Sequence, residues 1–190
     1  MKLSPTAVPG VVIVEPTVHA DARGWFMESF HAERFDAALH ALGLPPAGPF
    51  VQDNHATSHA GVLRGLHWQV APQAQGKLVR VLHGRAFDVA VDLRRGSAHF
   101  GRWVGVTLDA VHHHQLWLPP GFAHGMLALE DDTQMHYKCT APYAPECERT
   151  LRWDDPAPGI AWPLAPGQRP LLSARDAAAP GWAAAVEVRG

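Results

Sequence analysis

The chain has 190 residues, enough for one domain with a buried core, and its 16 Lys and Arg nearly balance its 18 Asp and Glu. This balance argues against nucleic acid or an acidic membrane surface as a partner, so any anionic ligand must be small and bound by local charges. No 18-residue apolar run or signal peptide is visible, and the only cysteines, Cys139 and Cys147, match no metal or redox motif, so we expect a cytoplasmic protein with reduced thiols.

The N-terminal part of the chain, residues 1–49, combines short strands with one helix. Residues 11–15 (VVIVE) form a β-rich run, and residues 21–26 (DARGWF) resemble a turn that leads into another strand. Over residues 30–42 the apolar side chains recur at helical spacing, and a glycine and two prolines follow. We therefore expect a helix in this last segment.

The central part, residues 50–153, consists of short runs of alternating apolar and polar residues that turn signals separate. Strands of this spacing, with no helices between them, predict an antiparallel β-sandwich or barrel, because each strand must bury one face against a second sheet. The predicted strands lie within residues 50–58, 61–69, 76–84, 85–93, 102–109, 114–120, 124–130 and 134–140.

The C-terminal part, residues 154–190, is rich in proline and alanine and predicts an ordered segment that wraps over the core. Its tail, residues 173–188 (SARDAAAPGWAAAVEV), is expected to hold a short helix. Because no repeat and no long linker interrupts the chain, we expect residues 1–190 to form a single domain.

Two polar side chains lie in phase with small or apolar residues of their predicted strands. Lys77 alternates with Val79 and Val81, which indicates either an ammonium group inside the sandwich or an edge-strand lysine that prevents aggregation. His67 shares a strand face with Gly65, a residue that allows close approach to the backbone. His67 is therefore either a hydrogen-bonded core histidine or a reactive one, and the pattern leaves both alternatives open.

Other motifs also have a structural and a chemical interpretation. The PxGxxH pattern of residues 119–124 is similar to a metal motif of cupins, but the earlier strand that would complete the site has one histidine and no HxH pair, so we expect no metal. The His112–His114 tract is typical of a solvated turn. Tyr137 is either a buried structural tyrosine or a reactive one, and Ser173 and Asp176 have the spacing of a helix capping box.

Ten sequence blocks, in order over nearly the whole chain, resemble the dTDP-4-dehydrorhamnose 3,5-epimerase family, whose fold is a metal-free cupin jelly roll. Among them are GVLRGLHWQ at 61–69, QLWLPPGFAHGM at 115–126 and LSARD at 172–176. The resemblance implies a mainly β jelly roll with a few short helices, a homodimer and no cofactor. It also implies an isomerase that inverts C3 and C5 of dTDP-4-dehydro-6-deoxy-D-glucose to give dTDP-4-dehydro-L-rhamnose, in dTDP-L-rhamnose biosynthesis.

The same resemblance implies a role for each of several residues. The implied catalytic residues are a base, the carboxylate that orients it, a lysine that stabilises an enolate and a general acid, in that order His67, Asp176, Lys77 and Tyr137. The implied substrate-binding residues, some of them donated by a partner subunit, are Arg23, Glu28, Gln52, Asn54, Arg64, His124 and Tyr143.

Three other functions remain open from the sequence. An epimerase that acts on one carbon of a related dTDP-4-keto-deoxysugar would use the same groups. A non-catalytic carbohydrate-binding jelly roll would keep the fold but exchange no substrate protons. A metal-dependent cupin oxygenase would need the metal ligands that the chain lacks beside its PxGxxH pattern.

Overall fold

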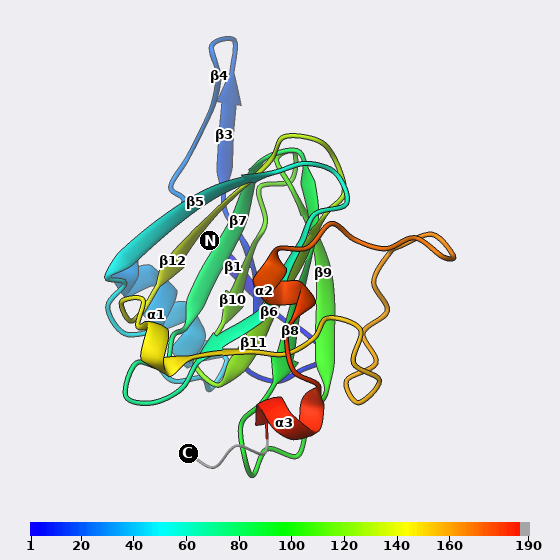
Figure 1. The fold of residues 1–190 in the computed structure, drawn as a ribbon. Helices are drawn as coiled ribbons and strands as arrows, with labels where there is room; N and C mark the ends of the chain where they lie inside the picture. Colours follow the sequence, from blue (N-terminus) through cyan, green and yellow to red (C-terminus); the bar gives the residue numbers. More distant parts are fainter. Residues whose placement is uncertain (187–190) are drawn as a thin grey trace.

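The computed structural model describes residues 1–186, which form two antiparallel β-sheets packed face to face (Figure 1). The first sheet has the strand order β1-β2-β10-β7-β12-β5, and the second has the order β13-β6-β11-β8-β9. A two-stranded hairpin, β3-β4, projects from this sandwich (Figure 1). The arrangement confirms the predicted mainly β jelly roll with a few short helices.

The strands of the first sheet are β1 (Lys2–Pro5), β2 (Val12–Glu15), β5 (Gln52–Ser58), β7 (Lys77–His83), β10 (Gln115–Leu118) and β12 (Thr133–Cys139). The second sheet contains β6 (Leu63–Gln69), β8 (Arg85–Asp92), β9 (Trp103–Asp109), β11 (Phe122–Ala128) and β13 (Glu148–Thr150). The remaining elements are β3 (Val18–Asp21), β4 (Gly24–Met27), α1 (Ala32–Ala41), η1 (Pro145–Cys147), α2 (Ala174–Ala177) and α3 (Trp182–Val186).

Most predicted elements are present. Each of the eight central runs overlaps a strand, although β11 and β12 begin before their predicted runs, the run at 11–15 contains β2, and the helical pattern at 30–42 contains α1. The segment at 21–26 contains the predicted turn and leads into β4, but the short strands β1, β3 and β13 were not predicted. The tail forms two short helices, α2 and α3, because Pro180 and Gly181 interrupt it, and residues 187–190 at its end lie outside the described residues.

The core between the two sheets explains which strand faces point inward. Val79 and Val81 of β7 pack there against Ala90 of β8 and Met126 of β11. Strand β7 lies between β10 and β12 in the middle of its sheet, so the edge-strand explanation of Lys77 is wrong. Because Lys77 alternates in phase with the two valines, its side chain enters the space between the sheets.

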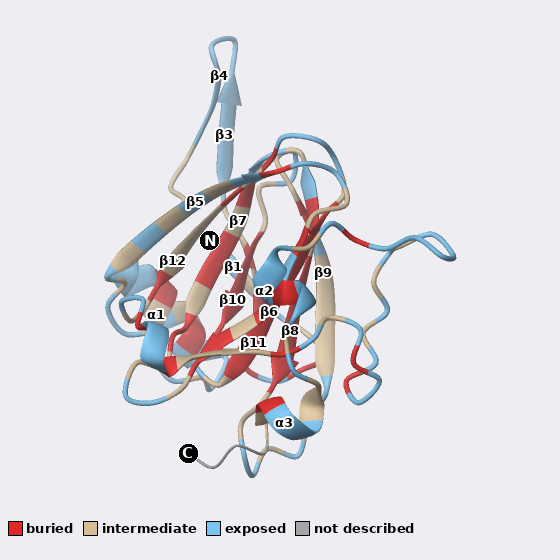
Figure 2. Ribbon diagram, in the orientation of Figure 1, coloured by how far each residue is buried: buried red, intermediate tan, exposed pale blue. Residues whose placement is uncertain are grey.

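The outer faces of the sandwich are covered as well. Helix α1 packs Phe35 and Leu39 against Trp117 on the first sheet, and the C-terminal segment packs Trp162 against Phe87 on the second. Figure 2 shows the buried residues concentrated on the strands of both sheets. Within residues 1–186, none of the helices is long and apolar enough to cross a membrane.

Strands β6 and β11 approach each other closely at a pair of glycines. Gly65 has a φ of +133°, and a Cβ added to it would lie 2.6 Å from the Cα of Gly125. This confirms that Gly65 permits a close backbone approach. The pairing of these strands sets the Cα of His67 opposite that of His124, so two histidines lie side by side on the second sheet.

Candidate active site

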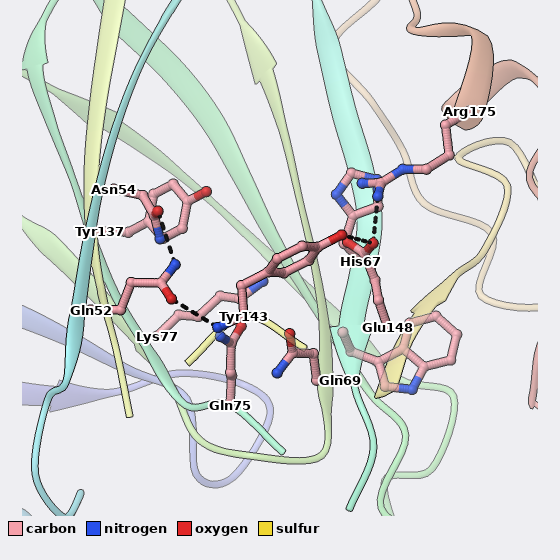
Figure 3. Close-up of a pocket in the computed structure, with 11 residues that line it drawn as sticks. Gln52, Asn54, His67, Gln69, Gln75, Lys77, Tyr137, Tyr143, Glu148 and Arg175 are labelled. Carbon is pink, nitrogen blue, oxygen red and sulfur yellow. Dashed lines mark hydrogen bonds and ion pairs between the residues drawn. The ribbon is translucent and has the colours of Figure 1, made fainter. Parts of the chain in front are cut away.

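Two adjoining cavities, of about 340 and 460 Å³, open between the sheets. They share four lining residues, His67, Lys77, Tyr137 and Arg175, and therefore form one continuous space, here called the cleft. Figure 3 shows how side chains from both sheets and from the C-terminal segment enter it.

Nine of the eleven predicted site residues line the cleft. They are His67, Lys77, Tyr137, Asp176, Gln52, Asn54, Arg64, His124 and Tyr143. They come from strands β5, β6, β7, β11 and β12, from helix α2 and from the loop after β12. Residues separated by up to 124 positions thus meet at one site.

His67 and Asp176 form a hydrogen-bonded pair at one wall of the cleft. The distance from His67 Nε2 to Asp176 Oδ1 is 2.5 Å. Burial raises the pKa of the Asp176 carboxyl, but the hydrogen bonds from His67 and Ser173 and the charges of His67 and Arg175 together hold the pKa below its ordinary value. The carboxylate therefore fixes the imidazole proton on Nε2, and Nδ1 is left as the ring nitrogen that can accept a proton.

Asp176 also has the structural role that its spacing from Ser173 indicated. The hydroxyl of Ser173 accepts a hydrogen bond from the Asp176 backbone N–H at 3.1 Å, and donates one to Asp176 Oδ2 at 2.8 Å. The two carboxylate oxygens are thus divided between Ser173 and His67. The helix cap orients the carboxylate, so the capping interpretation is confirmed, and the catalytic role that the resemblance implies stays a prediction.

Lys77 and Tyr137 enter the cleft from the first sheet. Burial lowers the pKa of the Lys77 ammonium and raises the pKa of the Tyr137 phenol. A desolvated ammonium interacts strongly with negative charge that forms nearby, and the phenol holds its proton over a wide pH range. Because His67 belongs to the second sheet, the imidazole and the phenol line opposite walls of the cleft.

A second histidine–carboxylate pair lies deeper in the cleft. His124 Nε2 is 2.9 Å from the buried Asp88 carboxylate, and its ring centroid is 6.5 Å from that of Tyr137. Asp88 was not among the predicted site residues. Its position on the inward face of β8, in phase with Ala90, was the available signal, because a buried carboxylate requires a partner.

Polar side chains extend the cleft on both sides of this centre. Arg64 donates to the Ser58 hydroxyl at 3.1 Å and to the Thr57 carbonyl at 3.0 Å. Gln52 donates to Asn54 at 3.0 Å and accepts from the backbone N–H of Tyr143 at 2.8 Å.

Apolar side chains form another part of the wall, and they were not predicted: Ala56, Met126 and Met135.

Arg175 and Glu148 are two charged lining residues that were not among the predicted site residues. Arg175 Nη1 is 2.5 Å from Glu148 Oε2, and Arg175 Nη2 is 3.3 Å from His67 Nε2 (Figure 3). The Tyr143 hydroxyl donates to the same Glu148 oxygen at 2.9 Å, and this bond raises the pKa of the phenol. Arg175 stands in the LSARD block beside Asp176, a signal that was available, whereas no motif marked Glu148.

Arg23 and Glu28 do not reach the cleft within one chain. Arg23 lies on the projecting hairpin and pairs with Asp21 at 2.6 Å, and Glu28 follows the hairpin and pairs with Arg34 at 2.8 Å. Their contact with substrate stays a prediction that depends on a partner subunit.

The histidine tract lies in the turn between β9 and β10, as predicted. His112 is 2.8 Å from Asp109, and the ring of His113 lies 4.3 Å from that of Trp25. Across residues 1–186, no three His, Cys, Asp or Glu side chains gather in the manner of a metal site. Cys139 and Cys147 are both buried free thiols.

Comparison with known proteins gives the chain clear relatives. The model of the dTDP-4-dehydrorhamnose 3,5-epimerase family matches residues 5–184. An enzyme of that name from Pseudomonas aeruginosa is 51% identical over 176 residues, which are 93% of this chain and 93% of the relative. Another, from Neisseria gonorrhoeae, is 49% identical over 97% of this chain, but the chain spans only 54% of that relative.

Solved structures of similar proteins include enzymes with bound sugar nucleotides. A dTDP-6-deoxy-D-glucose-3,5-epimerase from Legionella pneumophila, in complex with dTDP-4-keto-L-rhamnose, has a TM-score of 0.85 and 47% identity, and the match covers 94% of this chain and 90% of that one. A 3′-monoepimerase from Streptomyces bikiniensis, in complex with dTDP-quinovose, has a TM-score of 0.84 and 38% identity over 95% and 87% of the two chains.

Proposed function

This chain belongs to the dTDP-4-dehydrorhamnose 3,5-epimerase family, and from that premise we propose that it converts dTDP-4-dehydro-6-deoxy-D-glucose to dTDP-4-dehydro-L-rhamnose. The reaction inverts C3 and C5 of the sugar and belongs to dTDP-L-rhamnose biosynthesis. One observation carries the proposal for the chemistry: His67 and Tyr137 line opposite walls of a cleft into which Lys77 also projects.

The first step of each inversion is removal of a proton next to the C4 ketone. Nδ1 of His67 takes the proton from C3 or C5, and the electron pair of the broken C–H bond moves onto the C4 oxygen as an enolate. Asp176 stabilises the imidazolium that forms. The Lys77 ammonium stabilises the enolate oxygen, and one such donor contributes about 3 to 4 kcal/mol to a transition state.

The second step returns a proton to the opposite face of the same carbon. Tyr137 donates its phenolic proton, the enolate collapses to the ketone, and the centre is inverted. Proton exchange with water then restores the phenol and the neutral imidazole. The raised pKa of Tyr137 keeps this donor protonated before the step.

The nucleotide part of the substrate requires cationic and polar partners in a chain whose net charge is −2. Arg64 and Arg175 line the cleft and supply guanidinium groups, which suit a diphosphate because they form paired, charge-assisted hydrogen bonds. We assign Gln52, Asn54 and Tyr143 to further contacts with the nucleotide or the sugar, and His124 to the sugar.

A homodimer completes this proposal. The β3-β4 hairpin exposes Trp25 and Phe26, which are 57% and 70% accessible, and carries Arg23 away from the sandwich (Figure 1). Apolar side chains exposed on a projecting hairpin favour a protein partner. We propose that the hairpin packs on a second copy, where Arg23 and Glu28 reach the partner's cleft, and that the enzyme works in the cytoplasm.

The proposal predicts an alkaline limit to activity that Lys77 sets. Burial lowers the pKa of Lys77 and raises the pKa of Tyr137, so Lys77 should lose its proton first as pH rises. We therefore expect kcat/KM to fall as pH rises through the pKa of Lys77. Steady-state rates from pH 6 to 11 in wild type and Lys77→Arg measure this. In the variant the limit should move to higher pH, since a guanidinium stays protonated. An unmoved limit would assign it to another group.

Incubation of the substrate in deuterated water, followed by proton NMR, tests the function itself. We expect deuterium at both C3 and C5 and formation of the L-sugar, with neither in the absence of enzyme. Label at C3 alone would instead make the chain a single-carbon epimerase, as the similar 3′-monoepimerase is named. No label at either carbon would support a non-catalytic binding protein.

A further inference from the structure

The carboxylate of Glu148 connects two groups of the cleft that come from distant parts of the chain. One of its oxygens contacts both the Tyr143 hydroxyl, at 2.9 Å, and Arg175 Nη1, at 2.5 Å. We propose that Glu148 is a positioning residue, which holds Arg175 beside the His67–Asp176 pair and offsets its positive charge during proton abstraction. This inference rests on the proposed function.

The backbone fixes Glu148 close to the base. Strand β13 pairs with β6, with Glu148 opposite Gln69 and Thr150 opposite His67. The Glu148 side chain is only 17% accessible, whereas the Arg175 side chain is 49% accessible. The less exposed carboxylate is therefore the fixed partner, and the more exposed guanidinium is the one that it holds in place.

The charges around His67 give the pair a role in the reaction. Arg175 Nη2 is 3.3 Å from His67 Nε2, the nitrogen that bonds to Asp176. Before proton abstraction the groups His67, Asp176, Arg175 and Glu148 sum to one negative charge, and afterwards they sum to zero. Without the Glu148 carboxylate they would change from zero to one positive charge. An adjacent uncompensated guanidinium opposes formation of an imidazolium, so Glu148 makes proton abstraction easier.

This role predicts an effect on turnover rather than on substrate binding. Glu148→Gln keeps the shape of the side chain and an oxygen for Tyr143 but removes the charge. We expect kcat to fall about 10- to 100-fold, since a single lost charge contact changes such rates by one or two factors of ten. We expect KM to stay the same or to fall, because the released guanidinium still faces an anionic substrate.

A double-mutant cycle with Arg175→Gln tests whether Glu148 acts through Arg175. If it does, Glu148→Gln should lower kcat markedly in wild type but by less than about twofold in the Arg175→Gln background. Tyr143→Phe and Glu148→Gln form a second cycle. If Glu148 does not act through Tyr143, the fold losses of kcat from these two substitutions should multiply in the double variant. Glu146→Gln, an exposed acidic residue two positions earlier, is the matched control and should leave kcat unchanged.

The outcomes separate this inference from the proposed function. If wild-type protein incorporates no deuterium at C3 or C5, the proposed function fails. If wild type does so but Glu148→Gln keeps its full kcat, or loses the same factor with and without Arg175, the positioning role is wrong. A loss of kcat that disappears only in the Tyr143→Phe background would transfer the role from Arg175 to Tyr143. Thermal unfolding of each variant checks that the folded fraction is unchanged.

Discussion

His67→Asn is expected to lower kcat by about 100- to 10,000-fold, the range that a positioned general base contributes, and to abolish deuterium incorporation at C3 and C5. Asparagine places an amide near the position of Nδ1 and is too short to reach Asp176 as Nε2 does, and its amide has no nitrogen that accepts a proton. Because the reacting carbon is the only part of the substrate that His67 contacts in this mechanism, the affinity for dTDP, which lacks that carbon, should change little. Steady-state rates, NMR of the labelled product and calorimetric titration with dTDP measure these three quantities.

A histidine on another face of the protein serves as the control for this substitution. His55 is exposed on β5 and hydrogen-bonds Gln134 on the neighbouring strand, so His55→Asn should keep the wild-type kcat. Retention of more than about a tenth of the wild-type kcat in His67→Asn, with label still entering both carbons, would mean that another group removes the proton. His124 would then be the first residue to examine, since it lies opposite His67 and also bonds to a carboxylate.

The sequence predicts which side chains share a strand face, because residues alternate between the two faces of a strand. The alternation of β7 puts Lys77 in phase with Val79 and Val81, and the central position of β7 in its sheet makes that face the inner one. Strand order was the missing quantity, because alternation alone does not distinguish a central from an edge strand. The choice between an inward and an edge lysine therefore required the fold.

Contacts between segments far apart in sequence were harder to predict. Glu148 begins a three-residue strand with no strong β pattern, and its importance comes only from Arg175 and Tyr143, which other segments bring to it. Asp176 shows the opposite case, in which a local capping pattern with Ser173 was visible but gave no hint of His67, 109 positions earlier. Local patterns report caps and strand faces, whereas the site depends on non-local packing.

The cleft also explains why a resemblance identified more residues than the periodicity did. The alternation of β5 and β6 gave no sign of a binding role for Arg64, Gln52 or Asn54. Only the resemblance to the family predicted that these residues belong to the site, and all three line the cleft. Arg23 and Glu28 were marked in the same way, yet the single chain leaves them on and beside a projecting hairpin. A resemblance carries information about an assembled site, and part of that site depends on a second subunit in the proposed dimer.

Lys77→Met is expected to lower kcat by about 100- to 1000-fold, because it removes the ammonium that stabilises the enolate on the C4 oxygen. Methionine fills a similar volume and lies in phase with Val79 and Val81, so the sandwich should remain intact. Burial lowers the pKa of Lys77, so folding disfavours its charged form relative to the unfolded chain. The free energy of unfolding should therefore stay the same or rise, even as activity falls.

This opposite movement of stability and activity separates an electrostatic role of Lys77 from a structural one. Lys138→Met, on the outer face of β12 where the ammonium pairs with Asp53 at 3.0 Å, is the control and should keep the wild-type kcat. If Lys77→Met lowered the melting temperature and kcat together, the lysine would be needed for folding, and the lost rate would carry no information about the enolate. If it raised the melting temperature and kept its rate, another group would have to stabilise the enolate, and His124, which lines the same cleft and bonds to Asp88, would be the first to test.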